Sequence, residues 1–556
     1  MRYRMMLIGL LLGVIGVLSS GVVFAQTDEI TIEDLLPSRA DLEYTGSIAD
    51  DADEDDYLLD LEAGQAILFV AVQTDGFMDP YLRLADPNGA TIGENDDFNQ
   101  SIFQVNSLIA YIPEVSGKYT LTVTNYPGYA GGYDLSIYFV DNDFAINTIS
   151  YARLRLSGPV ETIDSDRFRV HFTRRGIDRT TFDYAQAVAD AMEEVYQTQI
   201  VELGWSPPPT DGILGGDDRY DVYLTDLLGT RGILGYAQPE LTAGDNPFTK
   251  YPEQAASYAF FVVDNDFDSS QLFTGADPIS LMRATAAHEF HHIVQFGYDI
   301  DEPMAWFYES TASWMEVVTF FEEEDASGYL PDSFDYPEVC FGAQGSADPA
   351  GLAIYAHWLY LEHIATEYNR NAVIHLWENI REYDGFDALE QTLELYDDTL
   401  VDSLVQYHIR NLLHDYEVAE VMTDYTVDIE DTIDGIGSWS PRNSGVQELA
   451  VNFYRLEAEQ DGVYRVILAN SDNDDLTLWG LGINGDNADI FSLGTDGSID
   501  TRDYEYVYVL VFNADYDNDV RRCSYSDYDL RVQRPYGAQA NDVFMTRDAS
   551  NFIPVR

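Results

Sequence analysis

The chain is poor in basic residues and in cysteine. Only two of its 29 basic residues are lysines, Lys118 and Lys250, against 98 acidic residues and a formal charge of −69. A field of this sign repels phosphate backbones and anionic lipid headgroups, so nucleic-acid and membrane-surface binding are disfavoured. Two cysteines are too few for a disulfide-rich scaffold. Cys340 and Cys523 are therefore either one interdomain disulfide or two unrelated thiols.

Long apolar runs are absent except at the start of the chain. Residues 7–24 are apolar, interrupted by glycine and serine, and follow the positive residues Arg2 and Arg4. Val23-Phe24-Ala25 approximates a small-residue cleavage site, so residues 1–25 are typical of a secretory signal peptide. The alternative is an uncleaved N-terminal anchor. We expect a secreted, extracellular protein with no stable membrane association after cleavage; its oligomeric state is not predicted.

The rest of the chain has the apolar content of several folded domains. At roughly 150 residues per domain, 556 residues suggest three or four. Short alternating runs separated by turn residues predict a β-sandwich over residues 42–141, after a spacer at 26–41. Alternation returns over residues 440–533, which predicts a second sandwich, followed by a polar tail at 534–556.

Between the two β segments, residues 142–435 combine strands with helices and predict an α+β domain. Phe168–Phe172, Asp221–Leu224 and Ser257–Val263 are the expected strands. Helices are expected at about residues 278–297, 302–323, 349–368, 370–381 and 385–414.

The helix expected at 278–297 carries the most informative motif. Asp277 is suited to cap its start, Pro278 to its first turn and Gly297 to its end. His288 and His292 then lie four residues apart on one face, where both imidazoles can reach one metal ion. Glu289 can approach water at that metal, in the His-Glu-x-x-His arrangement of zinc peptidases. The alternative is a surface helix with incidental histidines; His291 points elsewhere and is not predicted as a ligand.

A third ligand is expected from the next helix. Glu309 stands mid-helix among aromatic residues, where an unpaired carboxylate would be costly and a metal ion would remove the cost. The alternatives are that Glu309 is solvated, or that Glu316 is the ligand. The predicted site therefore has Zn²⁺ ligands His288, His292 and Glu309, with Glu289 as the catalytic residue.

Trp306-Phe-Tyr-Glu309 resembles the second helix of the gluzincin metallopeptidases. Phe168–Thr173, Gly215–Leu224 and Asp264–Phe267 resemble secreted bacterial metalloproteases in the broad style of the immune-inhibitor enzymes. The resemblance implies a zincin-like core, Zn²⁺, the same ligands and general base, and a substrate strand at Ser257–Val263. Ser313 departs from the pattern, because thermolysin-like enzymes have an aspartate there.

The order of motifs from Asp56-Tyr57 to Gly132-Tyr-Asp-Leu135 resembles the pre-peptidase C-terminal domain, an accessory module of secreted proteases. Two acidic loops are interpreted as solvated turn acids, because neither fits an EF-hand loop, with Ca²⁺ binding as the alternative. The first loop spans Asp211–Asp221; the second set is Asp79, Asp86, Asp96 and Asp97.

The predicted architecture is thus a multidomain chain, with a zincin-like α+β metallopeptidase core between two all-β sandwich domains. The predicted function is a zinc-dependent endopeptidase acting on proteins or peptides. The alternative is an extracellular binding or adhesion protein built on an inactive metallopeptidase fold. Tyr355, His357 and His363 are candidates for stabilising the oxyanion.

Overall fold

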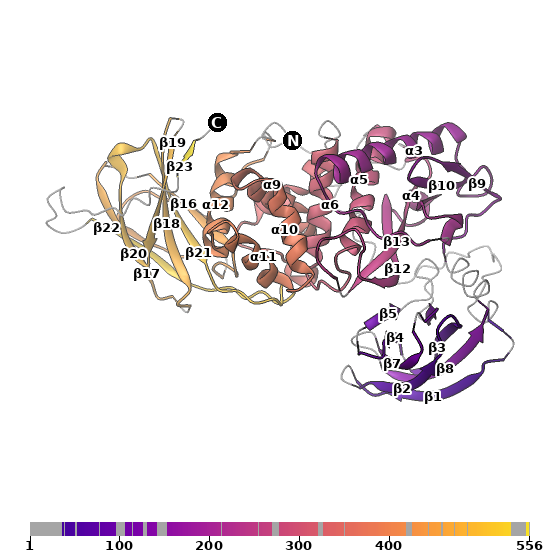
Figure 1. Cartoon of the computed structure of the whole chain (residues 1–556). Helices are drawn as coiled ribbons and strands as arrows, with labels where there is room; N and C mark the ends of the chain where they lie inside the picture. Colours follow the sequence, from indigo (N-terminus) through magenta and orange to yellow (C-terminus); the bar gives the residue numbers. More distant parts are fainter. Residues whose placement is uncertain are drawn as a thin grey trace. The chain divides into compact units, whose positions relative to one another are not determined.

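The computed structural model describes residues 36–534 and 552–554, apart from short gaps. The gaps are 38, 51–52, 77, 90, 96–105, 114, 126–129, 142–152, 213, 254, 269–276, 321–325, 350, 417, 419–424, 443, 458–459, 472 and 486. The expected signal peptide and most of the expected tail lie outside the described residues. The chain divides into two units, Met1–Asp301 and Glu302–Arg556. It is a mixed α/β protein with several sheets (Figure 1).

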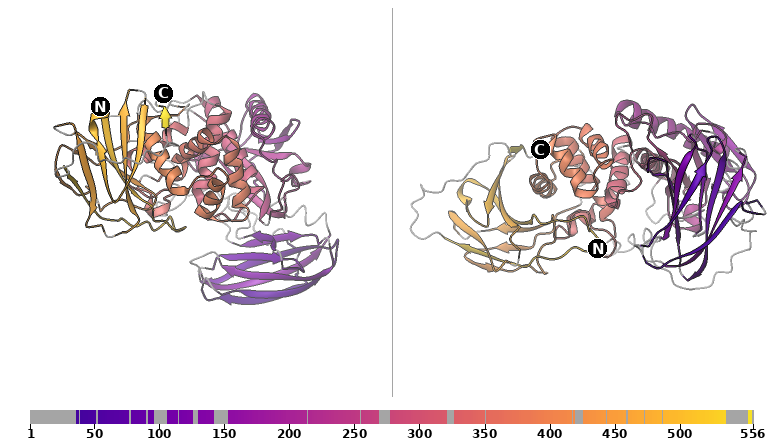
Figure 2. Two further views of the ribbon diagram at one scale, coloured as in Figure 1. Left: turned by 60° about the vertical axis from the view of Figure 1, so that its left-hand side comes forward. Right: turned by 60° about the horizontal axis from the view of Figure 1, so that its bottom comes forward.

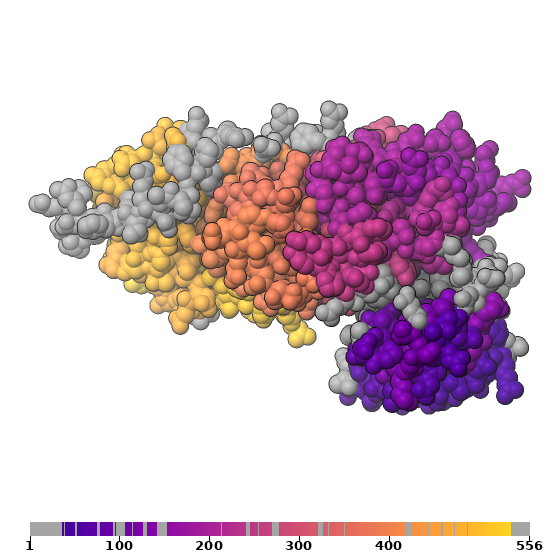
Figure 3. All heavy atoms as spheres, in the orientation of Figure 1, coloured from indigo at the N-terminus to yellow at the C-terminus, as the bar shows by residue number. Residues whose placement is uncertain are grey.

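The first unit begins with two four-stranded antiparallel sheets, in the orders β1-β8-β3-β6 and β2-β7-β4-β5. The strands are β1 (Leu42–Ile48), β2 (Asp55–Leu61), β3 (Ala66–Gly76), β4 (Pro80–Ala85), β5 (Thr91–Asn95), β6 (Ser107–Tyr111), β7 (Gly117–Asn125) and β8 (Gly131–Val140). Alternate residues such as Phe69, Leu84, Leu121 and Ile137 form one buried core shared by both sheets. The indigo atoms of these sheets pack closely on the visible face (Figure 3).

A five-stranded mixed sheet comes next in the same unit, in the order β12-β13-β11-β10-β9. Its strands are β9 (Val160–Asp164), β10 (Phe168–Thr173), β11 (Tyr220–Thr225), β12 (Gly235–Gly244) and β13 (Ala256–Asp264). The three central strands are parallel, and the outer two are antiparallel to them. The strands expected from Phe168, Asp221 and Ser257 are all present.

Two helices pack on this sheet: α3 (Phe182–Tyr196) against β10, and α5 (Pro278–Phe296) against β12 and β13. The shorter helical segments are η2 (Gln197–Glu202, π-helical), η3 (Leu214–Gly216) and α4 (Leu227–Thr230). Helix α5 agrees closely with the expected helix at 278–297.

The expected substrate strand at Ser257–Val263 lies inside the sheet. It forms most of β13, which bonds to β12 on one side and to β11 on the other. The β12 side is bonded along the whole of this segment, and the β11 side is bonded from Phe261 onward. A peptide therefore cannot pair with Phe261–Val263, and substrate pairing at Ser257–Phe260 stays a prediction. Within the described residues, β12 is the edge strand next to α5. Pro239 lies inside it at a shift of register, which is where sheets tolerate proline.

The second unit starts with helices (pink to orange in Figures 1 and 2). They are α6 (Ala305–Thr319), η5 (Ala326–Tyr329), α7 (Pro331–Asp335), η6 (Gly345–Ala347), α8 (Ala353–Ala356), α9 (Trp358–Glu367), α10 (Asn371–Ile380), α11 (Gly385–Glu394) and α12 (Leu400–Leu413). The single helix expected at 385–414 is wrong: Asp397 has a positive φ of 59°, and Thr399 caps a new helix by accepting from the Asp402 amide. The helix expected at 349–368 is likewise two segments, α8 and α9.

The same unit ends in two sheets, in the orders β14-β16-β21-β18-β19-β23 and β15-β22-β17-β20, seen as two layers in Figure 2. The elements are β14 (Asp431–Ile433), β15 (Gly437–Trp439), β16 (Val451–Leu456), β17 (Val463–Ala469), β18 (Leu476–Asn484), β19 (Asn487–Gly494), β20 (Asp496–Asp500), η8 (Thr501–Asp503), β21 (Tyr506–Asn513), β22 (Asp529–Gln533) and β23 (Phe552–Pro554). Val466, Leu478, Val509 and Leu530 share one buried core.

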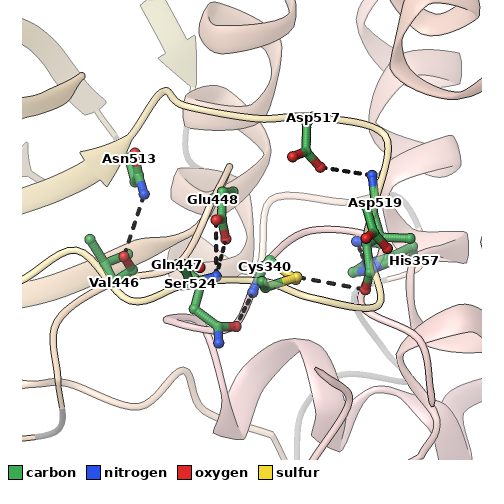
Figure 4. Close-up of a disulfide and its surroundings, with 12 residues drawn as sticks. Cys340, His357, Val446, Gln447, Glu448, Asn513, Asp517, Asp519 and Ser524 are labelled. Carbon is green, nitrogen blue, oxygen red and sulfur yellow. Dashed lines mark hydrogen bonds between the residues drawn. A yellow bond between two sulfur atoms is a disulfide. The ribbon is translucent and has the colours of Figure 1, made fainter. Parts of the chain in front are cut away.

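Cys340 and Cys523 form a disulfide, which decides between the two alternatives that the sequence leaves open. Their Cα atoms are 6.2 Å apart, and 183 residues separate them in sequence. Figure 4 shows hydrogen bonds on both sides: the Cys340 amide donates to the Gln447 side chain, and the Ser524 amide to Glu448. The bridge fastens the segment after α7 to the loop between β21 and β22.

Candidate metal centre

Helix α5 has the capping that its sequence predicts. The Asp277 carboxylate accepts from the amides of Ile279 and Ser280, both at 3.1 Å, and Pro278 occupies the first turn. The helix ends at Phe296, with Gly297 as the next residue. A helix fixed at both ends sets the direction of every side chain between them.

His288 and His292 lie side by side on this helix. Their ring centroids are 4.7 Å apart, the rings are nearly perpendicular at 84°, and both side chains are buried. The His292 Nδ1 atom is 2.8 Å from the Gln295 side-chain oxygen, and its ring stacks on Phe296 with centroids 6.2 Å apart. Two imidazoles in this arrangement are the donor type and spacing that zinc takes from a helix.

Glu289 is buried against the start of the edge strand β12. A methyl group placed at Gly235 would lie 2.7 Å from the Glu289 Oε1 atom and 2.9 Å from Thr285 Cγ2. Such distances are closer than van der Waals contact, so this close approach of backbone and carboxylate requires glycine. The general-base candidate therefore adjoins the first residue of β12, the edge strand of the sheet among the described residues.

His291 behaves as expected for a residue that packs. It is fully buried, its Nδ1 atom is 3.1 Å from the Gln199 side-chain oxygen, and the edge of its ring meets Trp205. Burial lowers the pKa of His291 well below its usual value. Its contacts belong to the interior behind α5 and not to the face of His288 and His292.

Glu309 belongs to the second unit, on α6, and its side chain is partly buried. Trp306 and Phe307 of the same helix are completely buried and anchor its first turns. Glu316 is more deeply buried than Glu309. The choice of Glu309 as the third ligand remains a prediction.

Two of the three oxyanion candidates are core residues. His357 accepts a hydrogen bond from the Gly342 amide through Nε2, and burial lowers its pKa to about 3. His363 is fully buried beside Tyr360 and Tyr407. Both histidines serve the helical core of the second unit. Tyr355 stacks on Tyr329 and is the candidate that is not fully buried.

The carboxylates of the first acidic loop, for which calcium was the alternative, are bound by arginine. Buried Arg153 bonds to the carboxylates of Asp211, Asp221 and Glu240. Asp217 pairs with Arg169 and Arg219. Burial raises the pKa of Asp211 to about 7 although Arg153 opposes the shift. The guanidinium of Arg153 thus occupies the position that a metal cation would take in this loop. In the second acidic set, Asp96 and Asp97 lie outside the described residues.

Two features of this site were not predicted from the sequence. The contact of Gln295 with His292 was not predicted, although Gln295 lies three residues after His292, within reach on a helix. Strand β12 was not predicted at all. The apolar residues Tyr236 and Leu241, on either side of Gln238-Pro239-Glu240, could have indicated it, since proline within a sheet marks an edge.

Residues 262–473 match the model of a family of unknown function, DUF6055. Among curated proteins no match is found. Similar solved structures include metallopeptidases and a pre-peptidase C-terminal domain. ZmpB metallopeptidase from Clostridium perfringens is 13% identical, over 84% of this chain and 94% of that chain, with a TM-score of 0.24. An aminopeptidase N family protein from Idiomarina loihiensis is 10% identical, over 87% and 98%, with a TM-score of 0.29. The pre-peptidase C-terminal domain of a Bacillus anthracis collagenase is 17% identical, over 17% and 87%, with a TM-score of 0.15.

Proposed function

We propose that the chain is a secreted zinc-dependent endopeptidase. Its zinc ligands are His288, His292 and Glu309, and Glu289 is its general base. The observation that carries the proposal is the arrangement on α5, where two buried imidazoles lie 4.7 Å apart and the Glu289 carboxylate adjoins Gly235, the first residue of the edge strand β12. With Glu309 as the third ligand, the two imidazoles would give zinc three ligand atoms of the types that it takes and leave a coordination position for substrate.

The chain's own residues supply the proton transfers of peptide hydrolysis. Zinc, when bound, supplies Lewis acidity that polarises the scissile carbonyl. Glu289 accepts a proton from the water molecule that attacks the carbonyl carbon. As the carbon–nitrogen bond breaks, Glu289 passes this proton to the leaving amine. Glu289 can serve both steps because the helix and Gly235 confine its carboxylate.

The edge strand β12 is the proposed docking place for extended peptides. Its inner edge is bonded to β13. Among the described residues no strand is hydrogen-bonded to its outer edge, although β5 packs against β12. An extended peptide can add to such an edge through main-chain hydrogen bonds, which read backbone more than side chains. This mode suits a substrate class of unfolded or loop segments of proteins.

Secretion is supported by the disulfide. Cys340–Cys523 is a structural disulfide of a kind that persists in oxidising compartments and is rare in the cytosol. It agrees with the signal-peptide pattern at residues 1–25. The described residues contain no helix whose length and apolarity would suit it to cross a bilayer.

The test is cleavage of casein by the mature protein, before and after chelation and with zinc restored. Glu289→Gln removes the base while keeping the shape of the side chain. We expect chelation to abolish cleavage, zinc to restore it, and the variant to lose it by a factor of about 10³ or more while still binding one zinc ion.

Other outcomes would decide against the proposal. Full cleavage by Glu289→Gln would remove the assigned base. A parent protein that binds no zinc would overturn the metal site. One bound zinc without cleavage of casein or of a peptide library would favour the binding-protein alternative.

A further inference from the structure

We propose that Gln295 is a positioning residue that holds His292 in the tautomer required for metal binding. This inference rests on the proposed zinc site. In this scheme the Gln295 side-chain oxygen accepts a hydrogen bond from His292 Nδ1 and so keeps the proton there. The unprotonated Nε2 atom is then available to the metal. Gln295 itself touches neither metal nor substrate in this scheme.

The hydrogen bond is short, internal and sheltered. His292 Nδ1 and Gln295 Oε1 are 2.8 Å apart, within the last turns of the same helix α5. Gln295 is completely buried, and His292 is 8% exposed. Water therefore competes weakly for either partner, and the bond is stronger than its equivalent at the surface.

The chemistry of the two groups sets the direction of the bond. A neutral imidazole has one nitrogen that donates and one that accepts. The amide oxygen of Gln295 can only accept, so His292 must donate from Nδ1. Its lone pair then lies on Nε2, and a metal ion binds through that lone pair.

The orientation of the ring is held as well as its tautomer. The ring of Phe296 stacks on His292 with an angle of 14° between their planes, and the His288 ring meets it edge-on. Gln295 bonds to one ring nitrogen and aromatic rings lie beside the imidazole, so His292 is oriented for metal binding before a metal ion binds. Such preparation lowers the cost of ordering the side chain on binding.

Another histidine of α5, His291, offers a matched control, because its partner is a glutamine from η2. Gln199 is another completely buried glutamine whose side-chain oxygen lies 3.1 Å from a histidine Nδ1, that of His291. Its amide group also donates to the Ala287 carbonyl. Because His291 is not a proposed ligand, Gln199 has the same chemistry without the same role.

The first measurement is zinc affinity by competition with a chromophoric chelator. Gln295→Met keeps the length of the side chain and removes the acceptor; Gln295→Glu keeps an acceptor oxygen. We expect Gln295→Met to weaken zinc binding about 10–100-fold, the usual effect of losing a partner of a ligating histidine. Gln295→Glu should bind zinc at least as tightly as the parent, and Gln199→Met should match the parent's affinity.

The second measurement is the tautomer of His292 in the metal-free protein, from nitrogen–proton correlation spectra of ¹⁵N-histidine-labelled chain. His292→Asn identifies its signals. We expect the proton on Nδ1 in the parent and in Gln295→Glu, and a mixture of tautomers in Gln295→Met. A parent with its proton on Nε2, or a Gln295→Met variant with unchanged tautomer and unchanged affinity, would overturn the role of Gln295.

These outcomes are separable from failure of the proposed function. If the parent binds no zinc while His292 carries its proton on Nδ1, the zinc site is wrong, although the hydrogen bond between Gln295 and His292 is confirmed. If zinc binds and cleavage persists but Gln295→Met behaves as Gln199→Met does, the peptidase stands and the positioning role is wrong.

Discussion

Glu309 is the proposed ligand that a single pair of substitutions can test. Glu309→Gln keeps the size of the side chain and replaces the carboxylate by a weaker donor. We expect it to lower zinc affinity by a factor of at least about 100. Zinc content after dialysis against a weak chelator measures this.

Glu316→Gln is its control on the same helix, since Glu316 was the alternative ligand and is also buried. The assignment requires that this variant keep one zinc ion per chain. The reverse pattern, with zinc lost from the Glu316 variant alone, would transfer the ligand role to Glu316.

Asp211 makes stability depend on pH. Burial raises its pKa in the folded chain to about 7 from 3.8. Between these values the folded state holds a proton that the unfolded state has released. This one group therefore lowers the free energy of unfolding as pH rises, by at most about 1.4 kcal/mol per pH unit. The loss is complete above the folded pKa.

Asp211→Asn removes this titration while leaving Asp221 and Glu240 on Arg153. We expect the variant to gain stability relative to the parent between pH 5 and pH 8, measured as the difference in denaturation midpoint at each pH. A difference that does not change with pH would contradict the assignment. Buried acids that do not contact Arg153 titrate alike in both proteins and cancel in the comparison.

For single residues, the sequence predicts the contacts that covalent spacing determines. Asp277, Pro278 and Gly297 delimit α5, and four-residue spacing brings His288 and His292 together, because helix geometry is the same in every protein. The partners of Asp211 are different. Arg153 and Glu240 reach it only after distant segments have packed, and no spacing rule connects them.

Among the elements, β12 is the one on which catalysis would depend most. Gly235→Ala places a methyl group 2.7 Å from Glu289 Oε1 and 2.8 Å from its Cγ atom. The side chain of Glu289 must then move, and a displacement of about 1 Å at a catalytic group can cost about 100-fold in rate. We expect kcat/KM for a peptide to fall at least about tenfold with zinc content unchanged.

Gly435→Ala is the matched control, because no atom lies within 4 Å of a methyl group placed there. It should retain the parent's kcat/KM. If Gly235→Ala also retained the parent's kcat/KM, the strand would not confine Glu289. The contact that connects the proposed peptide-docking strand β12 with the catalytic residue would then have no effect on catalysis.

The sequence predicted the central strands and missed the edge for one physical reason. Strands β10, β11 and β13 are bonded on both sides, buried and rich in Val, Tyr and Phe, so their pattern is strong. Strand β12 includes Gly235 and Pro239 and has one bonded side, so its composition resembles a loop. The break between α11 and α12 was missed because apolar periodicity continues across a turn that depends on Asp397.

For the whole molecule, the disulfide is the strongest single constraint on the second unit. It closes a loop of 183 residues, and a bridge over so long a loop typically contributes about 2–4 kcal/mol to stability. We expect the double variant Cys340→Ser, Cys523→Ser to melt at a lower temperature than the parent. Thermal circular dichroism, with and without a reducing agent, measures this.

The reducing agent is an internal control. It should lower the melting temperature of the parent toward that of the double variant and leave the variant unchanged. Equal melting temperatures for the oxidised parent and the double variant would mean that the surrounding hydrogen bonds, such as Cys340 to Gln447, hold this region without the bridge.

The same bridge affects how self-cleavage would be seen. A single cut at any peptide bond between Cys340 and Cys523 leaves two polypeptides that remain joined through sulfur. On a gel without thiol the nicked protein would keep the mass of the intact chain, and gel filtration would not separate its pieces. Processing within these 183 residues would become visible only after reduction, when one band becomes two.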